Sequence, residues 1–380
     1  MVYMEGRLAT VATLTACLLV AMALIVSSAA AQSSANYWAY VANESSDIVS
    51  LVRFDGHKVV EEKAIDVGFH PADLDGAHGI AVSPRGDYWY VSIAHGQPYG
   101  QIWQMETGTD QFVDSALVGL FPATMSTTPD GSTLFVVNFN LHGDHTPSTV
   151  SAVFTPMMEE IVQIETCVMP HGSRVSHDGQ RHYSTCMMSD QLVETTVHGL
   201  GISRKMVLTA GREHVMDAEH MASMGDDHDM GAEGVCKPTW VLLSPNDERI
   251  YVPCNGRGDV LEIDAESLEV LRRFPTGRGP YNADITPDGS KLVVTLKGAQ
   301  AVAIFDLATG GEIRVETSQP VTHGVAVTPD GRYAFVTNEA VGATRGTVDV
   351  VDLNTGTLVA SIELHYQPGG LAVWKMEGGG

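Results

Sequence analysis

The sequence is poor in basic residues. Its 380 residues include 22 lysines and arginines against 46 aspartates and glutamates, which gives a formal net charge of −24 at pH 7. Nucleic acids and anionic lipid surfaces bind through positively charged protein surfaces, because both carry dense negative charge. The composition therefore argues against either of them as a partner and is typical of a soluble, exported protein.

The sequence also lacks the short motifs that mark several large enzyme classes. It contains no P-loop, no dinucleotide-binding glycine fingerprint, no G-x-S-x-G turn and no C-x-x-C-H haem attachment site. Each of these motifs has a defined chemical role, so without them the sequence gives no reason to assign the protein to any of the corresponding enzyme classes. No catalytic residue can be named from the sequence, and whether the protein is an enzyme stays open.

A targeting segment is found at the N-terminus. Arg7 precedes an apolar run over residues 8–26, and Ala29-Ala30-Ala31 follow before Gln32. This order is typical of a signal peptide with an A-x-A cleavage site, which predicts removal of residues 1–31 and a periplasmic or secreted protein without a membrane span. Two alternatives remain: the run is long enough for an uncleaved membrane anchor, and Cys17 stands in a lipoprotein-like processing box.

One pattern recurs along the rest of the chain. Its clearest copy is an apolar run over residues 323–327, a Pro-Asp-Gly turn at Pro329, and Phe335-Val336-Thr337-Asn338. Two β-rich runs joined by an Asp-Gly turn predict a β-hairpin. The equivalent turns are separated by 45, 48, 68, 42 and 42 residues, and they begin at Pro84, Pro129, His177, Pro245, Pro287 and Pro329.

Periods near 42 residues with four strands per unit predict the blades of a β-propeller. The six turns give six blades. The chain ends predict a seventh, because Tyr40–Asn43 has a second-strand motif without a first strand before it, and residues 370–373 have a first-strand motif without a second strand after it. We therefore predict an all-β fold: one seven-bladed propeller domain over residues 32–380, with four-stranded antiparallel blades and one blade completed by both termini.

The repeat resembles a known family at this point. Tyr40–Asn43, Phe135–Asn138 and Phe335–Asn338 are similar to the YVTN repeat of bacterial and archaeal propellers, which include the YncE-like periplasmic proteins and surface-layer propellers. The wider superfamily resembles the propellers of the amine dehydrogenase β-chain, nitrite reductase and nitrous oxide reductase. The resemblance covers nearly all of the mature chain and implies a fold rather than a function, because the motif residues are structural.

Three histidines occupy equivalent positions in this repeat. His78, His171 and His323 each precede the glycine that opens a first strand, on the face of the propeller that we term the top. First strands line the central channel, so these side chains are expected to ring its mouth. Neutral imidazole is a ligand for copper, zinc and iron, which predicts a metal site; the alternative is that each His-Gly pair only caps a strand or binds water.

The 68-residue step contains an insertion at about residues 212–235 that is rich in histidine and methionine. Imidazole and thioether groups are both copper ligands, so we predict that this loop binds copper; the alternative is a disordered acidic loop. The candidate ligands in the insertion are His214, Met216, His220, Met221, Met224, His228 and Met230.

Four cysteines follow the targeting segment, and their spacing predicts two disulfides. A hairpin brings the start of its first strand beside the end of its second, which places Cys167 near Cys186 and Cys236 near Cys254. An even number of cysteines in an exported protein favours disulfides. The alternative is a thiolate metal site that joins Cys186 and Cys254.

These observations predict a periplasmic propeller that binds a transition metal, copper, at the top of its channel and serves metal handling or metal-dependent redox chemistry. Two other functions fit the fold. One is a scaffold without catalytic activity that presents its top face to a protein partner, and the other is a hydrolase of the lactonase type. No set of carboxylates for the hydrolase can be aligned in the sequence.

Overall fold

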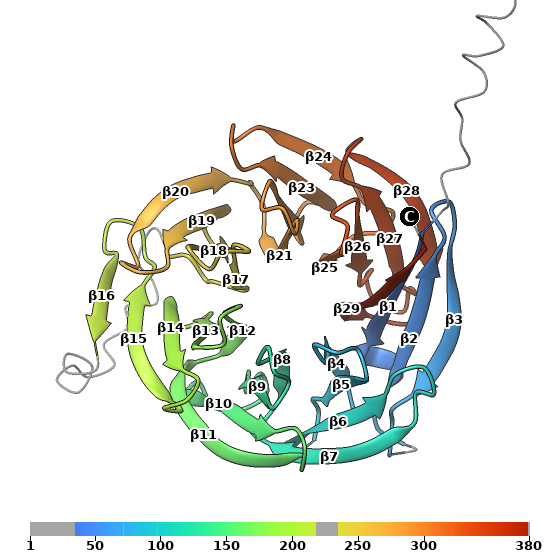
Figure 1. Ribbon diagram of the computed structural model, residues 1–380, viewed down its shortest axis with the longest axis horizontal. Helices are drawn as coiled ribbons and strands as arrows, with labels where there is room; N and C mark the ends of the chain where they lie inside the picture. The colour runs from blue at the N-terminus through green and yellow to red at the C-terminus, as the bar shows by residue number, and fades with distance from the viewer. Residues whose placement is uncertain (1–34, 71, 97, 218–234, 379–380) are drawn as a thin grey trace, which may run out of the picture.

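The computed structural model describes residues 35–70, 72–96, 98–217 and 235–378. Within them, seven antiparallel sheets are arranged as blades around a central channel (Figure 1). The predicted seven-bladed β-propeller is confirmed. The predicted signal peptide, residues 1–31, lies outside the described residues.

Each blade has four strands that follow one another from the channel to the rim, and blade 4 has a fifth at its outer edge. Blades 1 to 7 are numbered along the chain. The first strands, which line the channel, are β29 (Pro368–Glu377), β4 (Ala77–Val82), β8 (Pro122–Thr127), β12 (Pro170–Val175), β17 (Leu242–Leu243), β21 (Pro280–Ile285) and β25 (Thr322–Val327). The second strands are β1 (Asn36–Asn43), β5 (Tyr88–Ile93), β9 (Thr133–Asn138), β13 (Arg181–Cys186), β18 (Arg249–Cys254), β22 (Lys291–Leu296) and β26 (Tyr333–Asn338).

The outer half of each blade repeats the same order, and a single 3-10 turn, η1 (Glu44–Ser46), follows β1. The third strands are β2 (Ile48–Phe54), β6 (Gly100–Glu106), β10 (Pro147–Phe154), β14 (Gln191–Thr196), β19 (Asp259–Asp264), β23 (Ala301–Asp306) and β27 (Thr347–Asp352). The fourth strands are β3 (Val59–Asp66), β7 (Phe112–Val118), β11 (Glu159–Val168), β15 (Gly201–Val207), β20 (Val270–Pro275), β24 (Glu312–Glu316) and β28 (Thr357–Glu363).

Blade 1 is completed by both ends of the chain, as the sequence predicts. Strand β29 pairs with β1 in the order β29-β1-β2-β3, and Tyr40 stands opposite Ala372. The blue and dark red strands therefore lie side by side in Figure 1. This pairing closes the ring and leaves only short inner edges, which face the central channel and are protected there from pairing with another chain.

The threonine of the repeat motif ties neighbouring blades together at the channel. The hydroxyl of Thr337 accepts the Gly324 N–H at 2.8 Å and donates to the Gly369 carbonyl of the next blade at 2.7 Å. The approach is close enough that a Cβ on Gly324 would lie 2.5 Å from the Gly369 oxygen. A glycine is therefore required after the histidine, since any side chain would collide with the adjacent inner strand.

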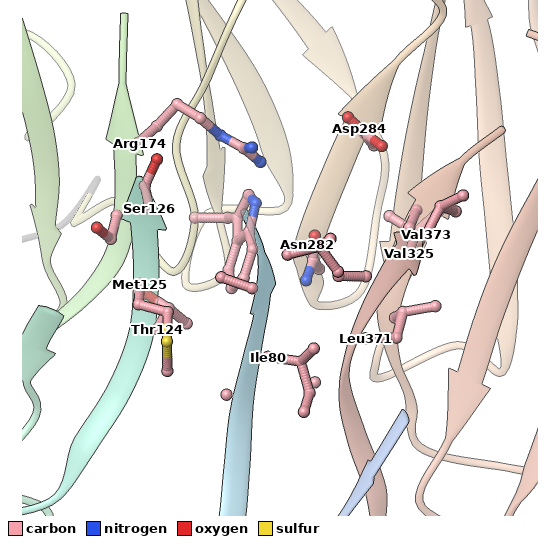
Figure 2. Close-up of a pocket in the computed structure, with 18 of the residues that line it drawn as sticks. Ile80, Thr124, Met125, Ser126, Arg174, Asn282, Asp284, Val325, Leu371 and Val373 are labelled. Atoms are coloured by element: carbon pink, nitrogen blue, oxygen red, sulfur yellow. The ribbon is translucent and has the colours of Figure 1, made fainter. Parts of the chain in front are cut away.

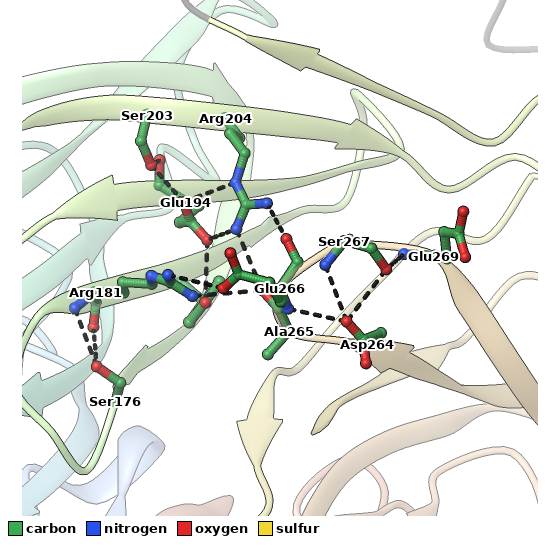
Figure 3. Close-up of polar contacts among 11 residues, drawn as sticks. Ser176, Arg181, Glu194, Ser203, Arg204, Asp264, Ala265, Glu266, Ser267 and Glu269 are labelled. Atoms are coloured by element: carbon green, nitrogen blue, oxygen red, sulfur yellow. Dashed lines mark hydrogen bonds and ion pairs between the residues drawn. The ribbon is translucent and has the colours of Figure 1, made fainter. Parts of the chain in front are cut away.

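The hydrophobic core lies between adjacent blades, and polar contacts reinforce it at the rim. Tyr40 of blade 1 stacks on Trp89 of blade 2 with ring centroids 4.8 Å apart. Figure 3 shows a polar junction of blades 4 and 5, where Arg204 binds Glu194 within its own blade and the Ala265 carbonyl of the next blade at 3.2 Å. These contacts fix the angle between blades and hence the shape of the channel.

Both predicted disulfides are present. Cys167 is bonded to Cys186 with Cα atoms 5.9 Å apart, and Cys236 is bonded to Cys254 with Cα atoms 4.4 Å apart. Cys167 belongs to β11 of blade 3 and Cys186 to β13 of blade 4, so this bond joins two blades. The alternative of a thiolate metal site between Cys186 and Cys254 is wrong, because both sulfurs are used in disulfides.

The insertion begins with a strand on the outside of blade 4. Residues His214–Asp217 form β16, a fifth strand in which Val215 pairs with Met206 of β15. Figure 1 places β16 on the outer rim, on the far side of its blade from the channel. The remaining candidate ligands of the insertion lie outside the described residues: His220, Met221, Met224, His228 and Met230.

Candidate functional site

The structure brings the three histidines of the repeat together at the top of the channel. The ring of His78 lies 6.4 Å from that of His171 and 6.4 Å from that of His323, measured between centroids. His171 and His323 are 1% and 4% exposed. Their equivalence is confirmed by the strand register, since the residue before each position pairs with the end of a second strand: Ala77–Ile93, Pro170–Cys186 and Thr322–Asn338.

His78 is anchored by a carboxylate at the end of β1. Its Nδ1 atom lies 2.8 Å from Oε2 of Glu44, and the other oxygen of Glu44 lies 3.1 Å from Nε2 of His95. Burial alone would raise the pKa of Glu44, but His78 and His95 outweigh it and hold that pKa well below its usual range. Glu44 in turn raises the pKa of His95 through their hydrogen bond. Glu44 is therefore an ionised, buried acceptor.

His171 is held on both ring nitrogens. Its Nδ1 lies 2.7 Å from the Thr239 carbonyl, which can only accept, so Nδ1 carries the proton. Its Nε2 then accepts from the hydroxyl of Tyr281 at 3.0 Å. Burial, with a smaller contribution from His78, lowers the pKa of His171 to about 3. The imidazole is therefore neutral, with its lone pair on the nitrogen that faces the cluster.

His323 lies on the opposite side of Tyr281, with ring centroids 4.5 Å apart. Its Nε2 is 3.3 Å from Glu339, which also pairs with Lys297 at 3.1 Å. Its Nδ1 is buried and has no hydrogen-bond partner among the described residues. Burial lowers the pKa of His323 well below its usual value, and Lys297 adds to this effect. Burial also raises the pKa of Glu339, although Lys297 opposes the rise.

The cluster has some, but not all, of the features of a metal site. Metal-binding histidines usually donate their second ring nitrogen to a carboxylate or a carbonyl, and His78 and His171 are held in this way by Glu44 and Thr239. No group of three metal-ligating side chains is already assembled in the residues that the structure describes.

The channel contains a cavity of about 380 Å³, which is lined by His78, His171, His323 and other residues of the inner strands. This volume is in the range of small-molecule sites, roughly 300–1,000 Å³. Figure 2 shows Arg174 and Asp284 at one end of this cavity and Thr124 toward the other. In the repeat, the three histidines stand one position before the level of Thr124, at the start of the inner strands.

The described ligands of the insertion lie elsewhere. His214 is exposed and its Nδ1 contacts the Arg212 carbonyl at 2.9 Å, while Met216 belongs to the same outer strand, β16. The structure therefore does not join this part of the insertion to the channel histidines. Within the described residues, the insertion and the channel are separate candidate sites.

Sequence reasoning missed the partners of the three histidines. Tyr281 occupies the equivalent position in blade 6, so the repeat alignment could have identified it as part of the ring. Glu44 has no such signal, because it lies in the turn after β1 and reaches His78 only in the folded ring. Lys297 and Glu339 follow second strands and are likewise brought in by the tertiary structure alone.

No protein-family model matches the sequence, and no curated protein is detectably similar to it. Solved structures do match. The hydrazine synthase of Kuenenia stuttgartiensis is 18% identical with a TM-score of 0.62, over 82% of this chain and 98% of that one. A Bacteroides fragilis protein assigned provisionally as a 6-phosphogluconolactonase is 14% identical with a TM-score of 0.65, over 89% of this chain and 98% of that one.

A protein of unknown function from Desulfotomaculum acetoxidans is also similar, at 14% identity and a TM-score of 0.65, over 88% of this chain and 98% of that one. At these identities the likeness establishes the β-propeller fold and nothing further. Resemblance to the YncE-like family therefore stays a prediction. Among the described residues, no helix is long and apolar enough to span a membrane.

Proposed function

We propose that this propeller binds a transition metal, copper, at the top of its channel, and that it acts after export in metal handling or metal-dependent redox chemistry. The observation that carries the proposal is the convergence of His78, His171 and His323, with two of the three rings oriented by an acceptor on Nδ1. Such an arrangement leaves Nε2 of His78 to a ligand, together with Nε2 of His171 once Tyr281 releases its hydrogen bond.

Metal binding would require a modest rearrangement of the cluster. Metal–imidazole bonds are about 2.0–2.1 Å long, and Nε2 of His171 is engaged by the Tyr281 hydroxyl at 3.0 Å. The hydroxyl would have to give up this hydrogen bond, and the rings would have to turn toward one another. His323 would contribute through the buried Nδ1 that has no partner. Glu44 and the Thr239 carbonyl would keep His78 and His171 in place.

We propose copper rather than another metal because the chain is rich in histidine and methionine at the insertion. Imidazole serves both oxidation states of copper, and thioethers select Cu(I). The insertion at about 212–235 carries three histidines and four methionines between His214 and Met230. We propose that it collects copper at the rim, separately from the channel. Export is proposed from the N-terminal segment, and the two disulfides are consistent with an oxidising compartment.

The similar solved structures do not choose between activities. One is described as a hydrazine synthase and another provisionally as a 6-phosphogluconolactonase, so one fold is used for different purposes. The proposal therefore depends on the side chains of this channel rather than on the fold.

The test is the copper content of protein purified from the periplasm, measured by mass spectrometry for the wild type and three variants. The variants are deletion of residues 212–235, His78→Ala, and the control His198→Ala, in which the altered side chain is exposed on the bottom face. Circular dichroism first establishes that each variant is folded.

We expect near-stoichiometric copper that survives the deletion and the control but is lost in His78→Ala. Copper lost with the deletion alone would place the metal on the rim and indicate storage or delivery. Protein that takes up neither Cu(I) nor Cu(II) after reconstitution would refute the metal hypothesis.

A further inference from the structure

A second polar group lines the channel below the histidines and is not part of the proposed metal site. Arg174, Trp240 and Asn282 each have a buried side-chain atom without a hydrogen-bond partner among the described residues: Nε, Nε1 and Oδ1, respectively. All three residues line the same cavity of about 380 Å³. Buried polar atoms are normally paired with protein, water or a ligand, so three unpaired atoms beside one cavity mark it as a polar binding region.

The repeat shows that this polarity is concentrated on one side of the channel. At the position after the histidines in the repeat, four of the seven blades have glycine, whereas blades 5 and 6 have Trp240 and Asn282. From blade 2 to blade 7 and then blade 1, the full set is Gly79, Thr124, Gly172, Trp240, Asn282, Gly324 and Gly370. Three positions after, blades 4 and 6 carry opposite charges among small or apolar residues: Ala81, Ser126, Arg174, Leu242, Asp284, Ala326 and Ala372.

The two charged residues face the cavity without forming an ion pair. The Nε atom of Arg174 has no hydrogen-bond partner among the described residues, although the charge of the side chain acts on Asp284. The oxygens of Asp284 accept backbone N–H groups of Val327 and Ile285 at 2.8 and 2.9 Å. Burial raises the pKa of Asp284, and Arg174 opposes the rise. Figure 2 shows Arg174 and Asp284 at the same end of the cavity on different inner strands, with Asn282 between their level and that of Ile80.

We propose that this part of the channel binds a small organic carboxylate that also carries hydroxyl or amino donors. Arg174 would hold the carboxylate, because a guanidinium fork matches two carboxylate oxygens. The indole N–H of Trp240 would donate to an oxygen of the ligand. The Oδ1 atom of Asn282 and the carboxyl group of Asp284 would accept from its hydroxyl or amino group.

A carboxylate fits this group better than a phosphate. Arg174 is the one arginine or lysine among the residues that line the cavity, and Asp284 stands in the same layer. A dianionic phosphate would meet a single positive charge and a nearby carboxyl group, whereas a monoanionic ligand with donors would satisfy both sides.

Isothermal titration calorimetry on chelator-treated protein tests the proposal independently of any metal. The probes are glycolate, D- and L-glycerate, L-malate and L-serine, with glycerol as the neutral analogue of glycerate and inorganic phosphate as the competing anion. We expect at least one hydroxy or amino carboxylate to bind, while glycerol and phosphate do not.

Arg174→Gln is expected to weaken that binding by about 10- to 100-fold, the loss of a charge-assisted hydrogen bond. Arg85→Gln is the matched control, because it removes the same charge from a side chain that is 80% exposed on a bottom-face turn. Trp240→Phe provides a second test if Arg174→Gln does not fold, and it should also weaken binding. Absence of binding by every carboxylate, binding unchanged in both channel variants, or tighter binding of phosphate would each overturn the proposal.

Discussion

Replacing Thr337 with valine removes a hydroxyl at the seam that closes the ring while it keeps the shape of the side chain. Thr337 is fully buried, and its hydroxyl joins Gly324 of blade 7 to Gly369 of the strand that completes blade 1. The substitution leaves one buried N–H and one buried carbonyl without their partner. Each unsatisfied group costs roughly 1–3 kcal/mol, so the free energy of unfolding should fall by about 2–6 kcal/mol.

Urea denaturation followed by tryptophan fluorescence measures this loss as a shift of the midpoint at constant slope. Thr337→Ser keeps the hydroxyl and should cost about 1 kcal/mol for the lost methyl group. Thr357→Val changes an exposed residue on an outer strand and should alter stability by less than about 0.5 kcal/mol. If Thr337→Val were no less stable than Thr337→Ser, the threonine hydroxyl would not be what joins the blades.

Three further results are expected. The double substitution Cys167→Ser and Cys186→Ser removes the inter-blade disulfide. It should lower the free energy of unfolding by roughly 3 kcal/mol, because the bond closes a loop of 19 residues. A calorimetric melting temperature equal to that of the wild type would contradict this prediction. Burial lowers the pKa of His182 to about 3 in the folded protein, whereas in the unfolded chain this histidine takes up a proton near pH 6.5. Its contribution to stability is therefore fully present above pH 6.5. As the pH falls from 6.5 toward 3, the free energy of unfolding decreases by about 1.4 kcal/mol per pH unit. Urea midpoints of wild type and His182→Gln between pH 5 and 7.5 should therefore show a shallower acid-side decline in the variant, and parallel curves would disprove the assignment. Glu44→Gln should weaken copper binding by about 10- to 100-fold through loss of the acceptor that orients His78, measured by competition with a chelator of known affinity, and an unchanged affinity would exclude His78 as a ligand.

The fold could be predicted from the sequence because the repeat is a local signal. The turn at Pro329 and the motif Phe335–Asn338 specify a hairpin by themselves, and copies at similar intervals then give the number of blades. The split blade followed from two half-motifs at the chain ends. The disulfides were predictable for the same reason, since a hairpin places Cys236 beside Cys254 whatever the rest of the ring does.

The alignment also gave the positions of the three histidines but not their chemistry. Repeat spacing shows that His78, His171 and His323 share one level of the channel. It does not show that Tyr281 stands between two of them, or that Glu44 reaches His78. These contacts depend on how far each blade is rotated against the next, and that rotation is set by packing between blades.

The insertion shows another limit of the sequence. Its composition predicts metal binding, yet composition could not indicate that residues His214–Asp217 would extend the outer edge of blade 4. The channel polarity of Arg174 and Trp240 was missed because each residue is unique to its blade. Polar residues that break a repeat at buried positions would have been the signal to follow.

The most direct test of the metal hypothesis is the position of copper in crystals of the copper-reconstituted protein, from anomalous scattering at the copper absorption edge. Our account predicts one strong peak at the top of the channel, bonded to Nε2 of His78 and of His171 and within reach of His323. A peak on the rim near β16 without one in the channel, or no peak in fully reconstituted protein, would contradict it.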